Sequence, residues 1–244
     1  MTSIGEKQEV YKNCYKLQIT PGIPIILKIN IRNYKKILSF TQKPFDNNLT
    51  DVLSQTAMYV ISQIQDAVFG YYHNDEINII IISNNESENW LNNDLQSIVS
   101  IGASLATVGF RESRDIWGDE LQIPSKIIFE ASVWGLPNTE EVLNYLVHRQ
   151  DSSIKHAINR AVWYHLEERM GYDKAYNLLS SKSYDDKEDI LLNYCGIDLY
   201  DFYDSYYIFG IALYKIREIK EGSSPKNRWY MNKNIPNFID DKEF

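Results

Sequence analysis

Two adjacent carboxylates, Asp75 and Glu76, lie between two apolar runs, Ala67–Tyr72 and Ile77–Ile82. Like charges held this close to buried strands repel each other and lose hydration unless a positive partner compensates them. A divalent cation is a suitable partner, because hard cations bind carboxylate and phosphate oxygens. A solvated hairpin tip is the alternative, since Asp and Asn are common turn residues. The pair therefore marks either a metal site or an ordinary turn.

The end of a predicted strand supplies the second group of candidate residues. Residues 23–30 are mostly branched apolar side chains, which predicts a buried strand, and the segment Asn30–Tyr34 follows directly. Phosphoryl transfer uses magnesium ions held by carboxylates, and Asn30 offers a neutral amide oxygen instead. A basic stretch around the strand end indicates either a clamp for a triphosphate or a solvated surface. Its members are Lys28, Arg32, Lys35, Lys36 and Lys43.

The elements that must position these residues follow one another as strand, helix, hairpin, helix and strand. An apolar stripe at helical spacing covers residues 49–64, a small-residue helix is expected over Asp94–Gly109, and a strand over Lys126–Val133. The order β-α-β-β-α-β is ferredoxin-like, a pattern shared by polymerase palms and many unrelated proteins. We predict an α+β fold, an antiparallel sheet with helices on one face.

The second half of the chain reads as helical. A helix is expected from Thr139 onward, with shorter ones over Asp173–Leu179 and Lys187–Tyr194 and a loop at Gly222–Pro225. There is no internal repeat and no low-complexity linker. We therefore predict a palm-like domain over residues 1–137 and a helical region over residues 138–244 packed on it.

Composition removes several classes of function. No apolar run approaches the roughly 20 residues that span a bilayer, and residues 1–16 lack the apolar core of a secretory signal. Cys14 and Cys195 are too few for a disulfide framework, so we expect a cytoplasmic protein without a membrane partner. The four histidines lack metal-ligand spacing, and His73 is expected at the surface. The net charge of −8 gives no support to nucleic-acid binding.

Taken in order, eight segments resemble motifs of the tRNA-His guanylyltransferase family, which includes 3′–5′ polymerases. Ile29–Tyr34 stands where the family has Asp-Gly-Arg-x-Phe, Lys43–Asp46 is similar to Lys-Pro-x-Asp, and Asn74–Glu76 is similar to Ser-Asp-Glu. The other five matching segments are Glu9–Tyr11, Phe129–Val133 with Leu136-Pro137, Asn144–Gln150, Asp186-Lys187 and Asn234–Phe238. Each motif is weak by itself, but their shared order is specific.

This resemblance implies a palm that adds GMP to the 5′ end of tRNA, with GTP, ATP and two Mg²⁺ ions. Asp75, the side chain of Asn30 and the carbonyl of Ile31 would be the metal ligands, and Asp75 and Glu76 the catalytic carboxylates. The family's partners imply contact with the tRNA 5′ end and assembly as a homotetramer or homodimer. The implied nucleotide-binding residues are Arg32, Asn33, Tyr34, Lys43, Asn74 and Lys187.

Several positions depart from the family pattern. Asn30 replaces the motif aspartate, Ile31 replaces a glycine, and Ser132 replaces an arginine. The His-Ile-Asn-Asn segment tied to tRNA-His recognition is absent, and residues 154–157 read Ile-Lys-His-Ala. Two functions follow: an active magnesium-dependent nucleotidyltransferase, or a catalytically impaired nucleotide- or RNA-binding paralogue. A small metabolite as acceptor is a third alternative.

Overall fold

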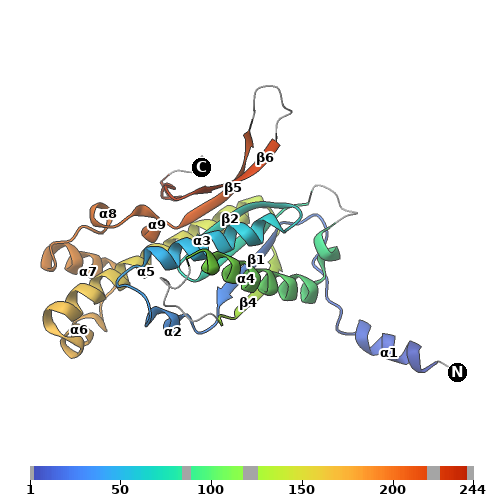
Figure 1. Ribbon diagram of the computed structural model, residues 1–244, viewed down its shortest axis with the longest axis horizontal. Helices are drawn as coiled ribbons and strands as arrows, with labels where there is room; N and C mark the ends of the chain where they lie inside the picture. Colours follow the sequence, from blue (N-terminus) through green and yellow to red (C-terminus); the bar gives the residue numbers. More distant parts are fainter. Residues whose placement is uncertain (1–2, 84–88, 118–125, 219–225, 241–244) are drawn as a thin grey trace.

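A computed structural model describes residues 3–83, 89–117, 126–218 and 226–240 (Figure 1). Within these residues six strands form one sheet, and all neighbouring pairs are antiparallel. The strands, in their order across the sheet, are β4 (Phe129–Gly135), β1 (Ile25–Ile31), β3 (Glu76–Ile81), β2 (Ala67–His73), β5 (Ile211–Glu218) and β6 (Lys226–Asn232).

Helices pack on the sheet and extend beyond its end, and most of them follow β4 in the chain (Figure 1). They are α1 (Ile4–Asn13), α2 (Tyr34–Leu38), α3 (Asn47–Ser62), η1 (Trp90–Asn93), α4 (Leu95–Trp117), α5 (Thr139–Met170), α6 (Tyr172–Leu179), α7 (Tyr184–Asp189), η3 (Ile190–Tyr194), α8 (Leu199–Phe202) and α9 (Ser205–Ile208).

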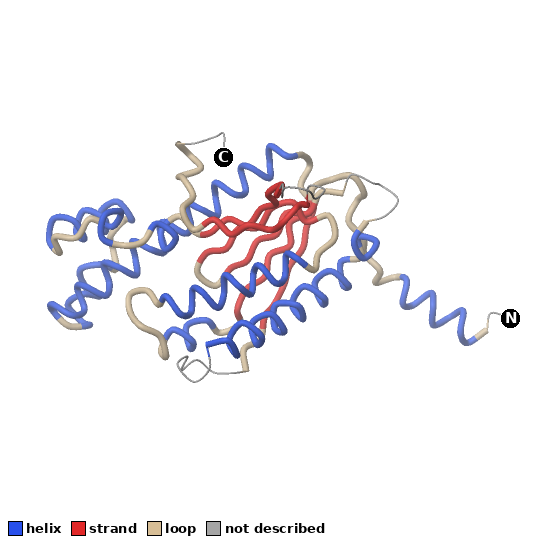
Figure 2. The backbone as a smooth tube through the Cα atoms, turned by 45° about the horizontal axis from the view of Figure 1, so that its top comes forward, coloured by secondary structure: helices blue, strands red, loops and turns tan. Residues whose placement is uncertain are grey.

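The order β4-β1-β3-β2 confirms the predicted ferredoxin-like arrangement. Helices α3 and α4 pack together over one face of the sheet, and α5 covers the opposite face (Figure 2). Because both faces are covered, every residue of β3 is buried. The helix α3 begins where the Asp46 side chain accepts a hydrogen bond from the Leu49 amide, as an N-cap residue does.

The face of the sheet under α5 changes from apolar to polar along the strands. Alternate residues of a strand share a face, so Ile26 packs with Ile80 beneath α5, and Lys28 and Asn30 continue the same row. On β3 the matching row ends in Glu76, which pairs in register with Asn30. The row on the other face stays apolar to its end and packs against α3 and α4. The candidate site therefore lies at the end of β1 and the start of β3, where polar side chains replace apolar ones on the face under α5.

The expectation of an entirely helical second half is wrong for β5 and β6. These two strands extend the sheet beyond β2, and Tyr71 of β2 pairs with Ala212 of β5. The sheet thus draws strands from both sides of the predicted boundary at residue 137. The predicted loop at Gly222–Pro225 lies outside the described residues.

Three further observations concern the termini and the surface. The α1 helix buries none of its residues and projects away from the sheet (Figure 1). Cys14 and Cys195 are both free thiols. Among the described residues, no helix combines the length and apolarity needed to cross a bilayer.

Candidate active site

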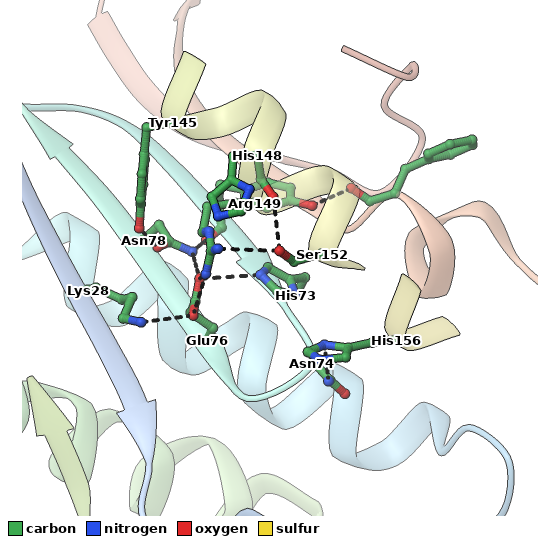
Figure 3. A network of polar contacts seen from close by, with 12 residues as sticks. Lys28, His73, Asn74, Glu76, Asn78, Tyr145, His148, Arg149, Ser152 and His156 are labelled. Carbon is green, nitrogen blue, oxygen red and sulfur yellow. Dashed lines mark hydrogen bonds and ion pairs between the residues drawn. The ribbon is translucent and has the colours of Figure 1, made fainter. Parts of the chain in front are cut away.

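Glu76 is the centre of a network of polar contacts between the sheet and α5 (Figure 3). One carboxylate oxygen lies 3.3 Å from Lys28 Nζ and 3.4 Å from an Arg149 guanidinium nitrogen. The other lies 3.3 Å from His73 Nε2 and accepts a 3.0 Å hydrogen bond from the Asn78 amide. β1, β2, β3 and α5 each contribute one of these partners, so the network ties the sheet to the helix.

The network keeps the Glu76 carboxylate ionised. Burial by itself would raise the pKa of Glu76, but the hydrogen bond and charge of His73, together with Asn78 and Lys28, hold it well below its ordinary value. The side chain is only 8% exposed. A carboxylate with this many donors has little capacity left to bind a metal ion, so the geometry gives Glu76 a structural part in the site.

Two expectations about this network need correction. Glu76 is the first residue of β3, so the hairpin turn is the two-residue Asn74-Asp75 and carries one acid. His73 is 4% exposed and contacts Glu76, so its predicted surface position is wrong. Lys28 forms an ion pair with Glu76 and does not line the cleft. Both errors have one cause, because the fold buries His73 and Glu76 between the sheet and α5.

Asp75 lies at the tip of the hairpin, next to the end of β1. Its backbone oxygen accepts a 3.2 Å hydrogen bond from the Ile31 amide, and its side chain lines an open cleft. Burial raises the pKa of Asp75, while a hydrogen bond to its own backbone amide and the charges of His73 and Lys28 oppose that rise. Within the described residues the Asp75 carboxylate has no salt-bridge partner.

The cleft has a volume of about 720 Å³, within the usual range for ligand sites. Its walls come from the β1 end, α2, the hairpin turn and α5, and the lining residues are Ile31, Asn33, Tyr34, Lys35, Lys36, Leu38, Asn74, Asp75, His156, Asn159 and Arg160. Lys35, Lys36 and Arg160 bring positive charge, and Asp75 is the only acid among the described residues that line the cleft. A cleft with this lining suits an anionic ligand held beside one carboxylate.

Asn74 connects the hairpin turn to α5. Its side-chain oxygen accepts a 2.9 Å hydrogen bond from Arg160 and a longer one, 3.5 Å, from the Tyr34 hydroxyl. Its amide nitrogen lies 3.1 Å from Nδ1 of His156. The residue adopts φ 57°, a left-handed conformation that Asn tolerates better than most residues. These contacts hold the turn that presents Asp75 to the cleft.

The structure brings some of the sequence-predicted residues together and separates others. Asn33, Tyr34 and Asn74 line the cleft, and Lys187 reaches its edge through a 2.9 Å hydrogen bond to Asn159. Lys43 is exposed in the loop before α3 and does not line the cleft. Arg32 lines a separate pocket.

Asn30 lies beside the hairpin but turns away from Asp75. It pairs with Glu76 in register, and residues directly opposite each other on two strands share one face of the sheet. The Asn30 side chain therefore lies on the Glu76 face, whereas Asp75 lines the cleft. The end of β1 contacts the hairpin turn through the hydrogen bond that the Ile31 amide donates to the Asp75 carbonyl.

His156 and Arg160 are site residues that the sequence did not reveal. They continue a polar stripe along α5 that begins with Arg149 and Ser152, with spacings of three or four residues. This stripe is the signal that could have found them, since polar residues at helical spacing mark one face. Burial, followed by the charge of His73, lowers the pKa of His156, which favours its neutral form.

The donors near the cleft are suited to a hard cation, but they carry little charge. No group of three or more His, Cys, Asp or Glu side chains in the described part of the chain could hold a metal ion. Asp75 and Ile31 line the cleft and offer a carboxylate and a carbonyl oxygen, whereas the Asn30 amide lies on the Glu76 face of the sheet, opposite Glu130. Hard oxygen donors of this kind fit Mg²⁺, and among them the Asp75 carboxylate carries the one formal negative charge.

Comparison with known proteins decides the family. Residues 6–137, more than half of the chain, match the family model described as tRNAHis guanylyltransferase. The chain belongs to the tRNA-His guanylyltransferase family. The match includes the β1 end, α2 and the hairpin turn, which line the cleft, whereas α5 lies beyond it.

Solved structures of the family share the fold. A bacterial tRNA(His) guanylyltransferase-like protein in complex with ATP is 24% identical, with a TM-score of 0.82 over 99% of this chain and 96% of that one. A structure of such a protein in complex with GTP is 23% identical, with a TM-score of 0.74 over the same shares. The tRNA(His) guanylyltransferase from Saccharomyces cerevisiae is 17% identical, with a TM-score of 0.73 over 94% of this chain and 98% of that one. No curated protein matches the sequence.

Proposed function

We propose that this protein is a nucleotidyltransferase that uses GTP and ATP to add a nucleotide, GMP, to the 5′ end of tRNA in the 3′–5′ direction. The observation that carries the proposal is the cleft at the β1 end, where Lys35, Lys36 and Arg160 surround Asp75. A triphosphate placed there meets three positive charges beside one carboxylate. Family membership supplies the reaction class, and family structures in complex with ATP and GTP support these nucleotides as ligands.

The chain's own residues account for binding and orientation. Lys35 and Lys36 are exposed on α2 and can follow a flexible triphosphate, whereas Arg160 is fixed by Asn74 and by the Phe45 ring, 5.2 Å from its guanidinium carbon. Because Arg160 also holds the hairpin turn, it couples the position of the triphosphate to the position of Asp75. Holding reactants in a fixed geometry is a large part of phosphoryl-transfer catalysis.

Mg²⁺ would be held by Asp75, with the Ile31 carbonyl as a neutral donor. Bound at this place, the ion would offset the negative charge of the phosphates. Glu76 would not be a ligand, because Lys28, His73, Asn78 and Arg149 already occupy its oxygens. In this arrangement Glu76 positions the hairpin and Asp75 is the catalytic carboxylate.

A nucleotide-binding paralogue with little or no turnover is the second candidate. One specific observation favours it: Asp75 is the only acid among the described residues that line the cleft, and Asn30 stands where the family motif has an aspartate. A lost carboxylate weakens transition-state stabilisation, and each loss of about 1.4 kcal/mol slows the reaction tenfold. Nucleotide binding would survive this change, because Lys35, Lys36 and Arg160 remain.

The deciding experiment incubates the protein with labelled GTP, ATP, Mg²⁺ and a 5′-monophosphorylated tRNA that lacks its first nucleotide. We expect a labelled product from the wild type, loss of product in Asp75→Ala, and a rate at least about tenfold higher in Asn30→Asp. Product from Asn30→Asp but not from the wild type would reject the proposal in favour of the binding paralogue. Product that persists in Asp75→Ala would show that the reaction does not use this cleft.

A further inference from the structure

A second pocket adjoins the cleft at the β1 end. It has a volume of about 300 Å³ and lies between α2, the residue that follows β1, and the segment that leads into β4. Arg32, Lys36 and Lys126 line it together with Asn33 and three isoleucines. The Arg32 amide donates a 2.9 Å hydrogen bond to the Ile128 carbonyl, so two walls of the pocket are fixed to each other.

The described residues that line this pocket carry an excess of positive charge. Among them are three cationic side chains and no acid, on a chain whose net charge is −8. Arg32, Lys36 and Lys126 make no salt bridge within the described residues, whereas Lys28 and Lys233 each pair with a carboxylate. Like charges gathered around a concave surface create a positive potential that attracts an anion.

We propose that this pocket binds a phosphate group at the 5′ end of the nucleic-acid strand that accepts the nucleotide. The inference rests on the proposed function, because transfer to a phosphorylated 5′ end requires two phosphate-bearing reactants at adjacent places. Asn33 and Lys36 line both the cleft and the pocket, so anions bound in the two sites are neighbours. The Arg32 guanidinium suits a phosphate, which it can bind with two parallel hydrogen bonds.

The apolar part of the pocket also suits a nucleotide end. Ile37 is 5% exposed and forms a buried wall, while the Ile128 side chain at the rim is 62% exposed. An exposed isoleucine beside a cationic pocket gives a sugar or base a surface to pack on. A pocket of this volume accommodates a phosphate with its ribose, at the lower end of the usual range for ligand sites.

The test measures binding of a short oligoribonucleotide with a 5′-monophosphate and of the same strand with a 5′-hydroxyl, by fluorescence polarisation. We expect the wild type to prefer the 5′-phosphate by roughly tenfold, as for a charge-assisted contact. The double variant Arg32→Gln/Lys126→Gln removes this preference, and the single variant Lys126→Gln, at a residue that does not line the cleft, leaves ATP and GTP affinity unchanged. The salt dependence of binding weakens in the variant by about 0.7 in log–log slope for each lost phosphate contact.

A matched control is Lys7→Gln/Lys174→Gln, which removes two exposed charges on α1 and α6, at positions that do not line the pocket. This control keeps the 5′-phosphate preference. If thermal unfolding shows that the double variant is not folded, the single variant Lys126→Gln replaces it. We expect this single variant to lose the preference for the 5′-phosphate as well.

Three results would overturn the inference. The first is equal affinity of the wild type for the two strands, and the second is an equal loss of affinity for both strands in the double variant. The third is a double variant that binds ATP and GTP more weakly but still prefers the 5′-phosphate. The last result would place Arg32 and Lys126 in the clamp of the nucleotide. Because binding is measured without turnover, a wild type that prefers the 5′-phosphate but transfers nothing would reject the proposed function and keep this site.

Discussion

Replacing Glu76 by Gln tests the network beneath α5. The substitution keeps the shape of the side chain and removes its charge, leaving Lys28 and Arg149 without their carboxylate. The side chains of these partners are 27% and 18% exposed, so water compensates part of the loss. Breaking a fully buried pair costs about 3–5 kcal/mol, and we expect about 2–4 kcal/mol here. For a chain of this size that corresponds to a decrease in Tm of roughly 4–16 °C at pH 7.

The pH dependence of this difference has a definite sign. The folded pKa of Glu76 lies well below its unfolded value of 4.5, so the carboxylate's contribution is complete above about pH 4.5 and is lost as the pH falls toward the folded pKa. The stability gap between the wild type and Glu76→Gln should therefore be constant from pH 7 to pH 5 and should narrow below pH 4.5.

Thermal unfolding followed by circular dichroism over this pH range measures both effects. Glu130→Gln is the matched control, because Glu130 is an exposed carboxylate on the neighbouring strand β4 and should change stability by less than about 0.5 kcal/mol. A Glu76→Gln variant as stable as the wild type at pH 7, or a gap that widens in acid, would refute the assignment of the network.

The remaining predictions concern the cleft and the sheet. Lys35→Gln/Lys36→Gln should weaken GTP binding roughly tenfold and lower its salt dependence, as isothermal titration can measure; an unchanged dissociation constant would contradict the clamp. Asn74→Gly keeps the left-handed turn and removes the contact to Arg160, so GTP affinity should fall with Tm nearly unchanged. Asn74→Ala should also lower the free energy of unfolding, by about 1–2 kcal/mol of backbone strain. Gly210→Ala should lower the unfolding free energy by about 2 kcal/mol or more, because φ is +84° and the new Cβ would lie 2.7 Å from the Tyr71 ring; a stable variant would contradict the described packing.

The parts of the fold that were predictable are those whose signal is local. The strand over residues 23–30, the α3 stripe and the small residues of α4 each carry their periodicity within one segment, and the structure has elements at all three places. Strands β5 and β6 were missed because β5 pairs with β2, about 140 residues earlier in the chain. Helix α4 extends to Trp117, beyond the predicted end at Gly109.

The candidate site was predictable in its parts but not in its orientation. The sequence placed Asn30 beside the acidic pair, and the register of β1 with β3 does bring them together. It could not show that Glu76 turns toward α5 while Asp75 lines the cleft, because the partners that hold Glu76 come from β1, β2 and α5. The α5 contribution, His156 and Arg160, depends on how a 32-residue helix is rotated against the sheet, which packing decides.

A crystal structure of the protein grown with GTP and Mg²⁺ tests the central claim most directly. We predict triphosphate density in the cleft, with phosphate oxygens near Lys35, Lys36 and Arg160 and a cation at the Asp75 carboxylate. Triphosphate bound at another place, or an empty cleft at a GTP concentration that saturates binding in solution, would contradict the account.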